Sequence, residues 1–319
     1  MKKIAVLTSG GDAPGMNAAL RAVVRTAVYY GIKVVGVKRG YSGLIKGDFI
    51  TMEIGSVADI IQRGGTILRT ARCDEFFTQE GRDVAVRNLR SIGVEGLVAI
   101  GGDGTFRGGV ELEKLGMPVV GIPGTIDNDI PCTNWTIGFD TAVNTVVDAI
   151  NKIRDTATSH ERVFVIEVMG RRAGFIALAA GLAGGAESIV IPEEHFDINE
   201  IVAKIQRGQN RGKLHSIILV AEGVSSAFEI SKKIHDISGL DTRVTILGHI
   251  QRGGTPTAWD RILASKMGAE AVNLLMKGER KKMVGIQGSK IENFDIEWAL
   301  NQPHEINMED YILSGILAI

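Results

Sequence analysis

The sequence alternates short, β-branched apolar runs with longer amphipathic stretches, and this alternation is its strongest constraint on the fold. Most of the short runs are apolar at nearly every position, as strands are when helices cover both faces of their sheet. The pattern therefore predicts an α/β fold with two lobes, each a mostly parallel sheet flanked by helices. The expected strands are Ile4–Leu7, Lys33–Val37, Gly96–Ile100, Val119–Ile122, Val163–Val168, Ser188–Ile191, Ile217–Val220 and Val244–Leu247.

Two of the longer stretches predict helices that bury one side. Apolar residues recur at helical spacing over 142–153 and over 262–275, which places each set along one stripe of a helix. We expect both stripes, Ile262 included, to pack in the protein core.

Composition excludes a protein that binds polyelectrolytes. The 319 residues carry 36 Lys plus Arg against 37 Asp plus Glu, which leaves no surplus of charge for nucleic acid or anionic lipid. Cys73 and Cys132 are too few for a disulfide framework, and the longest charge-free apolar stretch, 173–186, is shorter than a membrane span. We therefore expect a soluble cytoplasmic protein.

Glycine is the unusual component of the chain. There are 40 glycines, where an average usage of about 7% would give roughly 22. Glycine lets backbone N–H groups approach a ligand closely, and a glycine turn between a strand and a helix N-terminus is a ready anion site. Glycine pairs follow short apolar runs and so indicate phosphate-binding turns, at 10–11, 64–65, 101–102, 184–185 and 253–254.

Two turns in the first half suit a phosphate accompanied by a cation. TSGGDAPGMN at 8–17 follows the first expected strand, and GGDGT at 101–105 follows the third. A carboxylate at Asp103 would repel a phosphate unless a cation lay between them, so Asp103 predicts a magnesium ligand. The alternative role of Asp103 is to cap the helix expected over 106–115, and a tight structural turn would explain 8–17 equally well.

A third turn, PGTIDND at 123–129, carries two carboxylates at the end of the fourth expected strand. If the segment is extended, Asp127 and Asp129 point the same way, and their repulsion near a magnesium-bound phosphate would tune one of them as a base. A plain loop of turn-forming residues is the alternative.

Arginines gather at expected turns in the second half of the chain. A guanidinium binds phosphate oxygens bidentately and keeps its charge when desolvated. Any one of these arginines alone is explained by a solvated surface charge, but several beside glycines predict a focused site for a phosphorylated small molecule. His249 would bind sugar or phosphate there, or be structural. The arginines are Arg154, Arg162, Arg171, Arg172, Arg243 and Arg252.

Five motifs in order resemble those of the bacterial ATP-dependent 6-phosphofructokinases over nearly the full chain. GGDGT alone is shared with NAD kinases and lipid kinases, whereas the ordered set is specific. The resemblance implies a Rossmann-like, three-layer phosphofructokinase fold and transfer of the ATP γ-phosphoryl group to the 1-hydroxyl of fructose 6-phosphate, a glycolytic step with Mg²⁺ as cofactor. It also implies a homotetramer. The motifs are GGDAPGMN at 10–17, GGDGT at 101–105, PGTIDND at 123–129, MGRRAG at 169–174 and LGHIQRGG at 247–254.

The resemblance also implies individual roles. Asp127 would accept the hydroxyl proton, with Thr125 and Arg171 beside the transferred group and Asp103 on the metal. Arg162 and Arg243 would reach a neighbouring subunit's sugar phosphate. The implied ATP site comprises Gly11, Arg72, Cys73, Gly102, Asp103, Gly104 and Thr105. The implied fructose 6-phosphate site comprises Thr125, Asp127, Arg162, Met169, Gly170, Arg171, Glu222, Arg243, His249 and Arg252.

A separate effector site for ADP or phosphoenolpyruvate is implied at a subunit interface. Ile54 and Leu214 stand where some members of the family have cations, and the loss of those charges should weaken anion binding. Gly104 and Gly124 stand where pyrophosphate-using relatives have Asp and Lys, which favours ATP. The implied effector residues are Arg21, Arg25, Arg154, Gly185, Glu187, Arg211 and Lys213.

The motifs also suggest how the chain divides. We expect an ATP-binding domain made of 1–138 and 251–301, and a fructose 6-phosphate-binding domain made of 139–250 and 302–319. An NAD or lipid kinase would explain GGDGT but not PGTIDND or the arginine turns. A catalytically silent nucleotide sensor on the same scaffold would have lost Asp103 or Asp127, and both are present.

Overall fold

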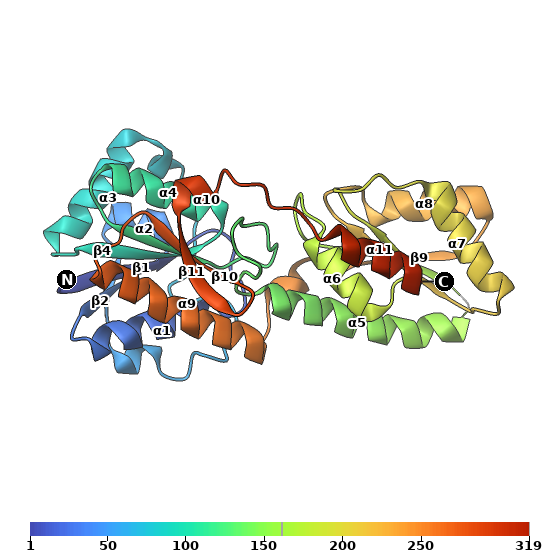
Figure 1. The fold of residues 1–319 in the computed structure, drawn as a ribbon, viewed down its shortest axis with the longest axis horizontal. Coiled ribbons are helices and arrows are strands. Elements are labelled where there is room, and N and C mark those ends of the chain that lie inside the picture. The colour runs from blue at the N-terminus through green and yellow to red at the C-terminus, as the bar shows by residue number, and fades with distance from the viewer. Residues whose placement is uncertain (161, 319) are drawn as a thin grey trace. The chain divides into compact units, whose positions relative to one another are not determined.

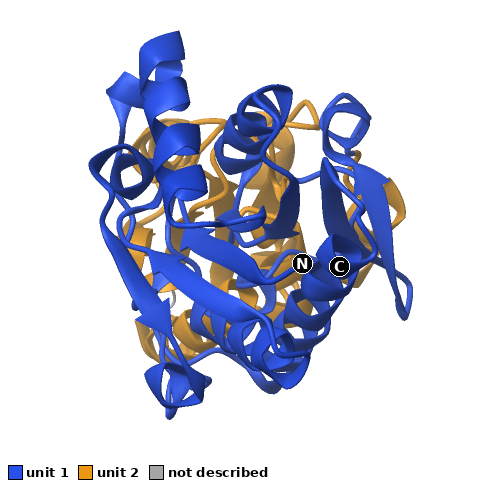
Figure 2. Cartoon of the chain, turned by 90° about the vertical axis from the view of Figure 1, so that its left-hand side faces the viewer, with its two compact units in different colours: residues 1–126, 130–141, 252–304 blue, residues 127–129, 142–251, 305–319 orange. Residues whose placement is uncertain are grey.

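The computed structural model describes residues 1–160 and 162–318 (Figure 1). These residues divide into two compact units, each built around its own sheet (Figure 2). Ile319, the end of the expected second domain, and Glu161 within it lie outside the described residues. The assignment of an ATP-binding and a sugar-phosphate-binding domain stays a prediction. Unit 1 contains 1–126, 130–141 and 252–304, and unit 2 contains 127–129, 142–251 and the segment from 305 onward.

Among the described residues of unit 1, seven strands form one sheet in the order β11-β10-β5-β4-β1-β2-β3. The five central strands run parallel, and the two edge strands β3 and β11 are antiparallel to their neighbours. The strands are β1 (Lys3–Thr8), β2 (Lys33–Val37), β3 (Phe49–Met52), β4 (Gly96–Gly101), β5 (Val119–Pro123), β10 (Lys282–Gln287) and β11 (Lys290–Asp295).

Helices cover both faces of this sheet, with α1 and α9 on one side and α2, α3, α4 and α10 on the other (Figure 1). Helices α1 and α9 approach so closely that a Cβ at Gly268 would lie 2.8 Å from Ala19 O. Two short 3-10 helices, η1 (Ile54–Val57) and η2 (Asp74–Phe77), lie in the connections. The α-helices of unit 1 are α1 (Met16–Tyr29), α2 (Gly40–Lys46), α3 (Gln79–Ser91), α4 (Asp103–Lys114), α9 (Ala258–Met276) and α10 (Ile296–Ala299).

Within the described part of unit 2, four strands form a fully parallel sheet in the order β7-β8-β6-β9. They are β6 (Val163–Val168), β7 (Ser188–Val190), β8 (Ser216–Ala221) and β9 (Thr242–Ile246). Helix α5 (Phe139–His160) begins in unit 1 and continues into unit 2, and the 3-10 helix η3 (Gly248–Arg252) follows β9. The remaining helices are α6 (Phe175–Gly184), α7 (Ile198–Asn210), α8 (Ala227–Ser238) and α11 (Met308–Leu317).

The α/β fold class with two lobes is confirmed, and all eight expected strands form with ends that differ by at most two residues. Helix α4 begins at Asp103, earlier than the expected residue 106. The expectation that Ile262 is buried is wrong: 50% of this residue is exposed, whereas Leu263 and Met267 are buried, because Ile262 lies beside the buried stripe and not on it. None of the described helices combines the length and the apolar character that a membrane crossing requires.

Candidate active site

Three glycine turns follow adjacent strands of unit 1. Strands β5, β4 and β1 are parallel neighbours, so their carboxyl ends lie at one edge of the sheet. Backbone hydrogen bonds join the turns where the strands end, from Ser9 N to Ile100 O and from Gly124 N to Gly101 O, each 3.0 Å long. The sheet therefore brings together the three front motifs that are separate in the sequence.

Gly101 is required by close packing, because a Cβ there would lie 2.5 Å from the backbone oxygen Ser9 O. At Gly11 the absent side chain leaves room for the Arg252 guanidinium, whose Nη2 atom would lie 1.8 Å from a Cβ. The Arg252 guanidinium also lies 3.5 Å from Asp12 Oδ1. Arg252, expected at the sugar phosphate, thus lies in unit 1 against Gly11, which was expected at the nucleotide.

Asp103 is the first residue of α4, and Gly102 is the residue that precedes the helix. The Asp103 side chain is 45% exposed and pairs with Arg107 Nε at 3.0 Å. The Thr105 hydroxyl oxygen is buried and has no hydrogen-bond partner within the described residues. The positive end of the helix dipole and an exposed carboxylate therefore meet at the second glycine turn.

Tyr41 supports this turn from the protein interior. Its hydroxyl donates a hydrogen bond to Thr105 O, and its ring stacks on Phe76 with centroids 4.1 Å apart. Burial raises the pKa of the Tyr41 hydroxyl, which remains a donor. Of the other expected nucleotide residues, Cys73 is half-buried and packs against the apolar cluster that contains Tyr41 and Phe76, and Arg72 is exposed.

Asp127 lies in unit 2 and is 4% exposed. Its Oδ2 atom lies 3.2 Å from Arg171 Nε, so the structure joins the expected base to the expected phosphate-binding arginine. The segment around Asp127 and Asp129 is not extended, because Asn128 has a left-handed backbone with φ 52, as in the alternative of a loop of turn-forming residues. The alternation of a strand therefore does not set the directions of the two carboxylates.

The turn that carries Arg171 connects β6 to α6 and is held by two carboxylates. Glu222 Oε1 accepts hydrogen bonds from Gly170 N at 3.3 Å and Arg171 N at 2.9 Å. Glu193 Oε1 accepts one from Gly174 N at 2.8 Å. Arg171 itself has a left-handed backbone with φ 54, a conformation that persists only when its surroundings enforce it.

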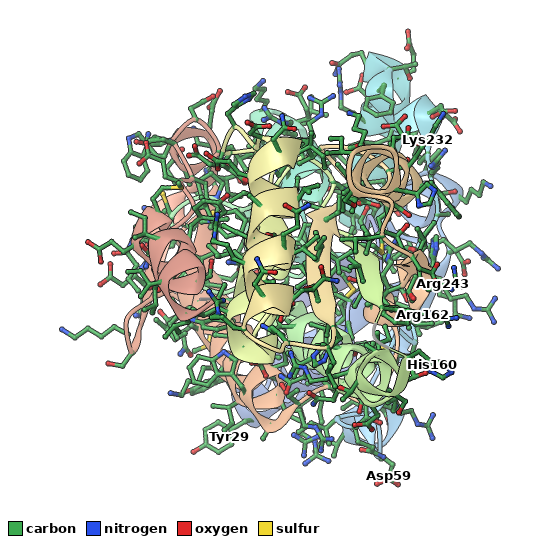
Figure 3. The ribbon with its side chains drawn as sticks, turned by 90° about the vertical axis from the view of Figure 1, so that its right-hand side faces the viewer. Tyr29, Asp59, His160, Arg162, Lys232 and Arg243 are labelled. Atoms are coloured by element: carbon green, nitrogen blue, oxygen red, sulfur yellow. The ribbon has the colours of Figure 1, made fainter. Side chains whose placement is uncertain are left out.

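Arg162 and Arg243 lie at the opposite edge of the same sheet. Arg162 directly precedes β6, and Arg243 is the second residue of β9, whereas Arg171 follows the carboxyl end of β6. The six residues of β6, at about 3.3 Å each, separate the two edges by roughly 17–20 Å. Figure 3 labels the two arginines, which lie near one another. Both bind one carboxylate: Asp241 Oδ2 lies 2.9 Å from Arg162 Nε, and Asp241 Oδ1 lies 2.7 Å from Arg243 Nη1.

Several expected effector residues come together in unit 2. Arg154, in helix α5 and not at a turn, donates hydrogen bonds to Gly184 O and Gly185 O. The buried Glu187 pairs with Lys213 Nζ at 2.5 Å. Of the other expected members, Arg211 directly follows α7 and is exposed, and Arg21 and Arg25 lie on α1 of unit 1.

His215 joins this cluster, although the sequence analysis did not select it. Its Nδ1 atom lies 3.1 Å from Thr158 Oγ1. Burial lowers the pKa of the imidazole, and Arg154 and Lys213 add to that lowering while Glu187 opposes it. Its position two residues after Lys213 in a basic segment is the sequence signal that would have identified it.

The remaining expected residues are accounted for by position. His249 is exposed in η3, Met169 directly follows β6, and Thr125 O accepts a hydrogen bond from Thr136 Oγ1 at 2.6 Å. Gly104 has nothing within 4 Å of a built Cβ. Residues 1–160 and 162–318 contain no group of three or more His, Cys, Asp or Glu arranged to hold a metal.

These turns and their order match known proteins. A family model described as phosphofructokinase matches residues 3–275. The chain belongs to the phosphofructokinase family. The family expected from the motifs is therefore confirmed.

Relatives named ATP-dependent 6-phosphofructokinase cover the whole chain. The protein from Halothermothrix orenii is 61% identical and that from Bacillus subtilis is 60% identical, each over 100% of both chains. Among solved structures, phosphofructokinase from Saccharomyces cerevisiae matches with a TM-score of 0.88 at 38% identity, over 94% of this chain and 45% of the yeast chain. A pyrophosphate-dependent phosphofructokinase from Marinobacter aquaeolei, with a TM-score of 0.86 at 21% identity over 97% of this chain and 86% of that one, shows the shared fold.

Proposed function

We propose that this phosphofructokinase transfers the γ-phosphoryl group of ATP to the 1-hydroxyl of fructose 6-phosphate, giving fructose 1,6-bisphosphate and ADP. The enzyme class expected from the sequence is confirmed by the full-length relatives of that name. The observation that carries the proposal is the convergence of the turns after β1, β4 and β5 at one sheet edge. Phosphoryl transfer depends mainly on positioning and charge neutralisation, which such turns supply.

Asp127 is the proposed base. It is nearly buried, so its carboxylate is shielded from water, and Arg171 lies close enough to hold its orientation. A carboxylate in this position accepts the proton of the attacking hydroxyl. Arg171, whose side chain is 64% exposed, can also offer its guanidinium to the oxygens of the transferred group, where negative charge develops.

Asp103 is the proposed magnesium ligand, and its surroundings fit that ion. Mg²⁺ keeps several waters and is bound through one or two carboxylates together with substrate phosphates. A single exposed carboxylate at a glycine turn suits such a site, since no protein cage is needed. Bound there, the ion would neutralise charge on the phosphates, while the Thr105 hydroxyl and the α4 amides contact phosphate oxygens.

The selection of ATP over pyrophosphate is proposed from two glycines. Gly104 leaves open space where a side chain would project, and a Cβ at Gly124 would lie 3.2 Å from both Ile100 Cγ2 and Met16 Cε. A longer side chain at either position would occupy space or add charge beside the nucleotide phosphates. Gly104 leaves that space to ATP, and at Gly124 the buried Ile100 and Met16 leave little room for a longer side chain.

Arg162 and Arg243 support a shared site in a homotetramer. They lie at the amino edge of the unit 2 sheet, whereas the Arg171 turn and Glu222 lie at its carboxyl edge. Residues at opposite edges of one sheet do not bind the same phosphate in the same chain. We propose that these two arginines bind the 6-phosphate of a neighbouring subunit's substrate.

An effector site for ADP or phosphoenolpyruvate is proposed at a subunit interface, where unit 2 would contribute Arg154, Gly185, Glu187, Arg211 and Lys213 and unit 1 would contribute Arg21 and Arg25. Ile54 and Leu214, both exposed, supply no charge to it. Each missing cation removes a charge-assisted contact. We therefore propose that regulation by anionic effectors is weak in this protein.

The test is the Asp127→Asn variant in an assay of ADP formation. We expect turnover to fall by about 10²- to 10⁴-fold, the usual contribution of a general base, with fructose 6-phosphate binding retained. Asp83→Asn, at an exposed position on α3, is the matched control and should leave turnover unchanged. Near-normal turnover of Asp127→Asn would refute its role, and ADP formation without fructose 6-phosphate in the wild type would refute the proposed reaction.

A further inference from the structure

Gln251 is a buried amide that no catalytic role accounts for. It is 0% exposed. Its Oε1 atom accepts a hydrogen bond from Met169 N at 3.2 Å, and its Nε2 atom donates one to Gly248 O at 3.0 Å. A buried amide is costly unless its polar atoms are paired, and here both ends of the side chain are paired with backbone.

The two backbone partners lie where the ladder between β6 and β9 ends. The paired residues run from Val163–Thr242 to Glu167–Ile246, and Leu247 N then donates to Glu167 O at 3.1 Å. Beyond that point the backbone that follows β6 and the backbone that follows β9 separate into different turns. The Gln251 side chain joins the next backbone groups, Met169 N and Gly248 O, and so continues the connection past the end of the sheet.

The connected turns are the two that carry the proposed sugar-phosphate residues. Met169 begins the Arg171 turn, whose following amides are held by Glu222. Gly248 begins η3, which carries His249. Gly248 has a left-handed backbone with φ 50, which glycine adopts without strain and which turns the chain from β9 into η3.

We infer that Gln251 is a positioning residue that holds the Met169–Arg171 turn and η3 in register, so that both present their groups to one fructose 6-phosphate. This inference rests on the proposed function. The Gln251 side chain hydrogen-bonds to backbone groups, and therefore its loss changes where the substrate-binding groups lie without removing any of them. Small displacements of binding groups reduce the effectiveness of a site steeply.

The test is Gln251→Met, which keeps the length and volume of the side chain and removes both hydrogen bonds. Initial rates of ADP formation are measured with varied fructose 6-phosphate at saturating magnesium-ATP, and then with the two substrates exchanged. We expect the KM for fructose 6-phosphate to rise by at least about tenfold, while the KM for ATP stays within about twofold of wild type.

Asn88→Leu is the matched control. Asn88 Nδ2 donates to Leu44 O and Ile45 O, each at 2.9 Å, so this variant also removes two amide-to-backbone hydrogen bonds, but in unit 1. We expect its KM for fructose 6-phosphate to equal that of wild type. An equal rise in both variants would overturn the inference, because it would show a general effect of lost stability.

Two further results separate the inference from the proposed function. A wild-type protein that forms no ADP with fructose 6-phosphate refutes the proposed function, whereas an active wild type with an unchanged Gln251→Met variant refutes only the role of Gln251. If circular dichroism shows that Gln251→Met is unfolded, Gln251→Glu decides the question. That variant keeps the acceptor for Met169 N, the bond that joins the two turns because Gln251 itself lies in η3, and loses only the donor to Gly248 O within η3. The inference therefore expects an unchanged KM for fructose 6-phosphate, and a tenfold rise would overturn it.

Discussion

Replacing the buried Asp260 by Asn should change how the stability of the protein depends on pH. Asp260 lies in the first turn of α9 and is 0% exposed. Its Oδ1 atom accepts a hydrogen bond from Gly138 N at 2.8 Å, and its Oδ2 atom accepts from Thr141 N at 2.9 Å and Thr141 Oγ1 at 2.5 Å. The carboxylate therefore caps the start of α5, the helix that continues from unit 1 into unit 2.

The sign of the pH effect follows from the titration of this group. Burial raises the pKa of Asp260 from 3.8 to about 6, against the opposing hydrogen bonds from Thr141 and Gly138. Between those two values the native state binds more protons than the unfolded chain. The free energy of unfolding contributed by Asp260 therefore falls as pH rises through this window, and it levels off above about pH 6. At about 1.36 kcal/mol per pH unit, the difference between the two pKa values corresponds to about 3 kcal/mol.

Urea unfolding followed by circular dichroism measures this effect for wild type and Asp260→Asn across the same pH range. The free energy of unfolding of wild type minus that of the variant should decrease by about 2 kcal/mol between pH 4 and pH 7, with most of the change below about pH 6.5. The corresponding difference for the exposed control Asp83→Asn should stay flat. A wild-type advantage that is constant, or that grows with rising pH, would refute the argument that desolvation dominates at Asp260.

Two further substitutions test the separate halves of the proposed site. Tyr41→Phe removes the hydrogen bond to Thr105 O, so it should lower the free energy of unfolding by about 1 kcal/mol and raise the KM for ATP but not for fructose 6-phosphate. Tyr29→Phe, at an exposed position (Figure 3), is the control. An unchanged KM for ATP in Tyr41→Phe would contradict the role of Tyr41. Arg162→Ala should raise the KM for fructose 6-phosphate by at least about tenfold with little change for ATP, whereas Lys232→Ala on α8 of the same unit should change neither; equal effects of Arg162→Ala on the two substrates would contradict its placement.

The strands were predictable because their signal is local. Runs such as Val163–Val168 are apolar at nearly every position and need no distant partner to be recognised. Strands β3, β10 and β11 were not among the expected strands. The apolar run of β10, Lys282–Gln287, is short and contains Gly285, and in β11, Lys290–Asp295, polar and apolar residues are mixed. Such runs give a weak strand signal, so their pairing is decided by the neighbouring strand.

The residues that support the site were harder to predict than those that form it. Asp103 and Asp127 lie within glycine motifs, and the motif itself indicates their chemistry. Gln251 and Asp260 act on partners 82 and 119 to 122 residues away in the chain, and no local spacing indicates that they are buried. The left-handed backbone of Asn128 was equally hidden, because a short polar segment fits a turn and an extended strand alike.

The placement of Arg162 and Arg243 at the sheet edge opposite Arg171 determines which chain loses activity when one chain carries a substitution at either arginine. In the proposed assembly, each chain contributes Arg162 and Arg243 to a substrate pocket whose other residues come from the neighbouring chain. A chain damaged at either arginine would then disable an intact copy next to it and keep its own pocket working. In a mixed population each altered chain would then remove one working pocket from a neighbouring chain, so the defective pockets would lie partly in chains whose own sequence is intact.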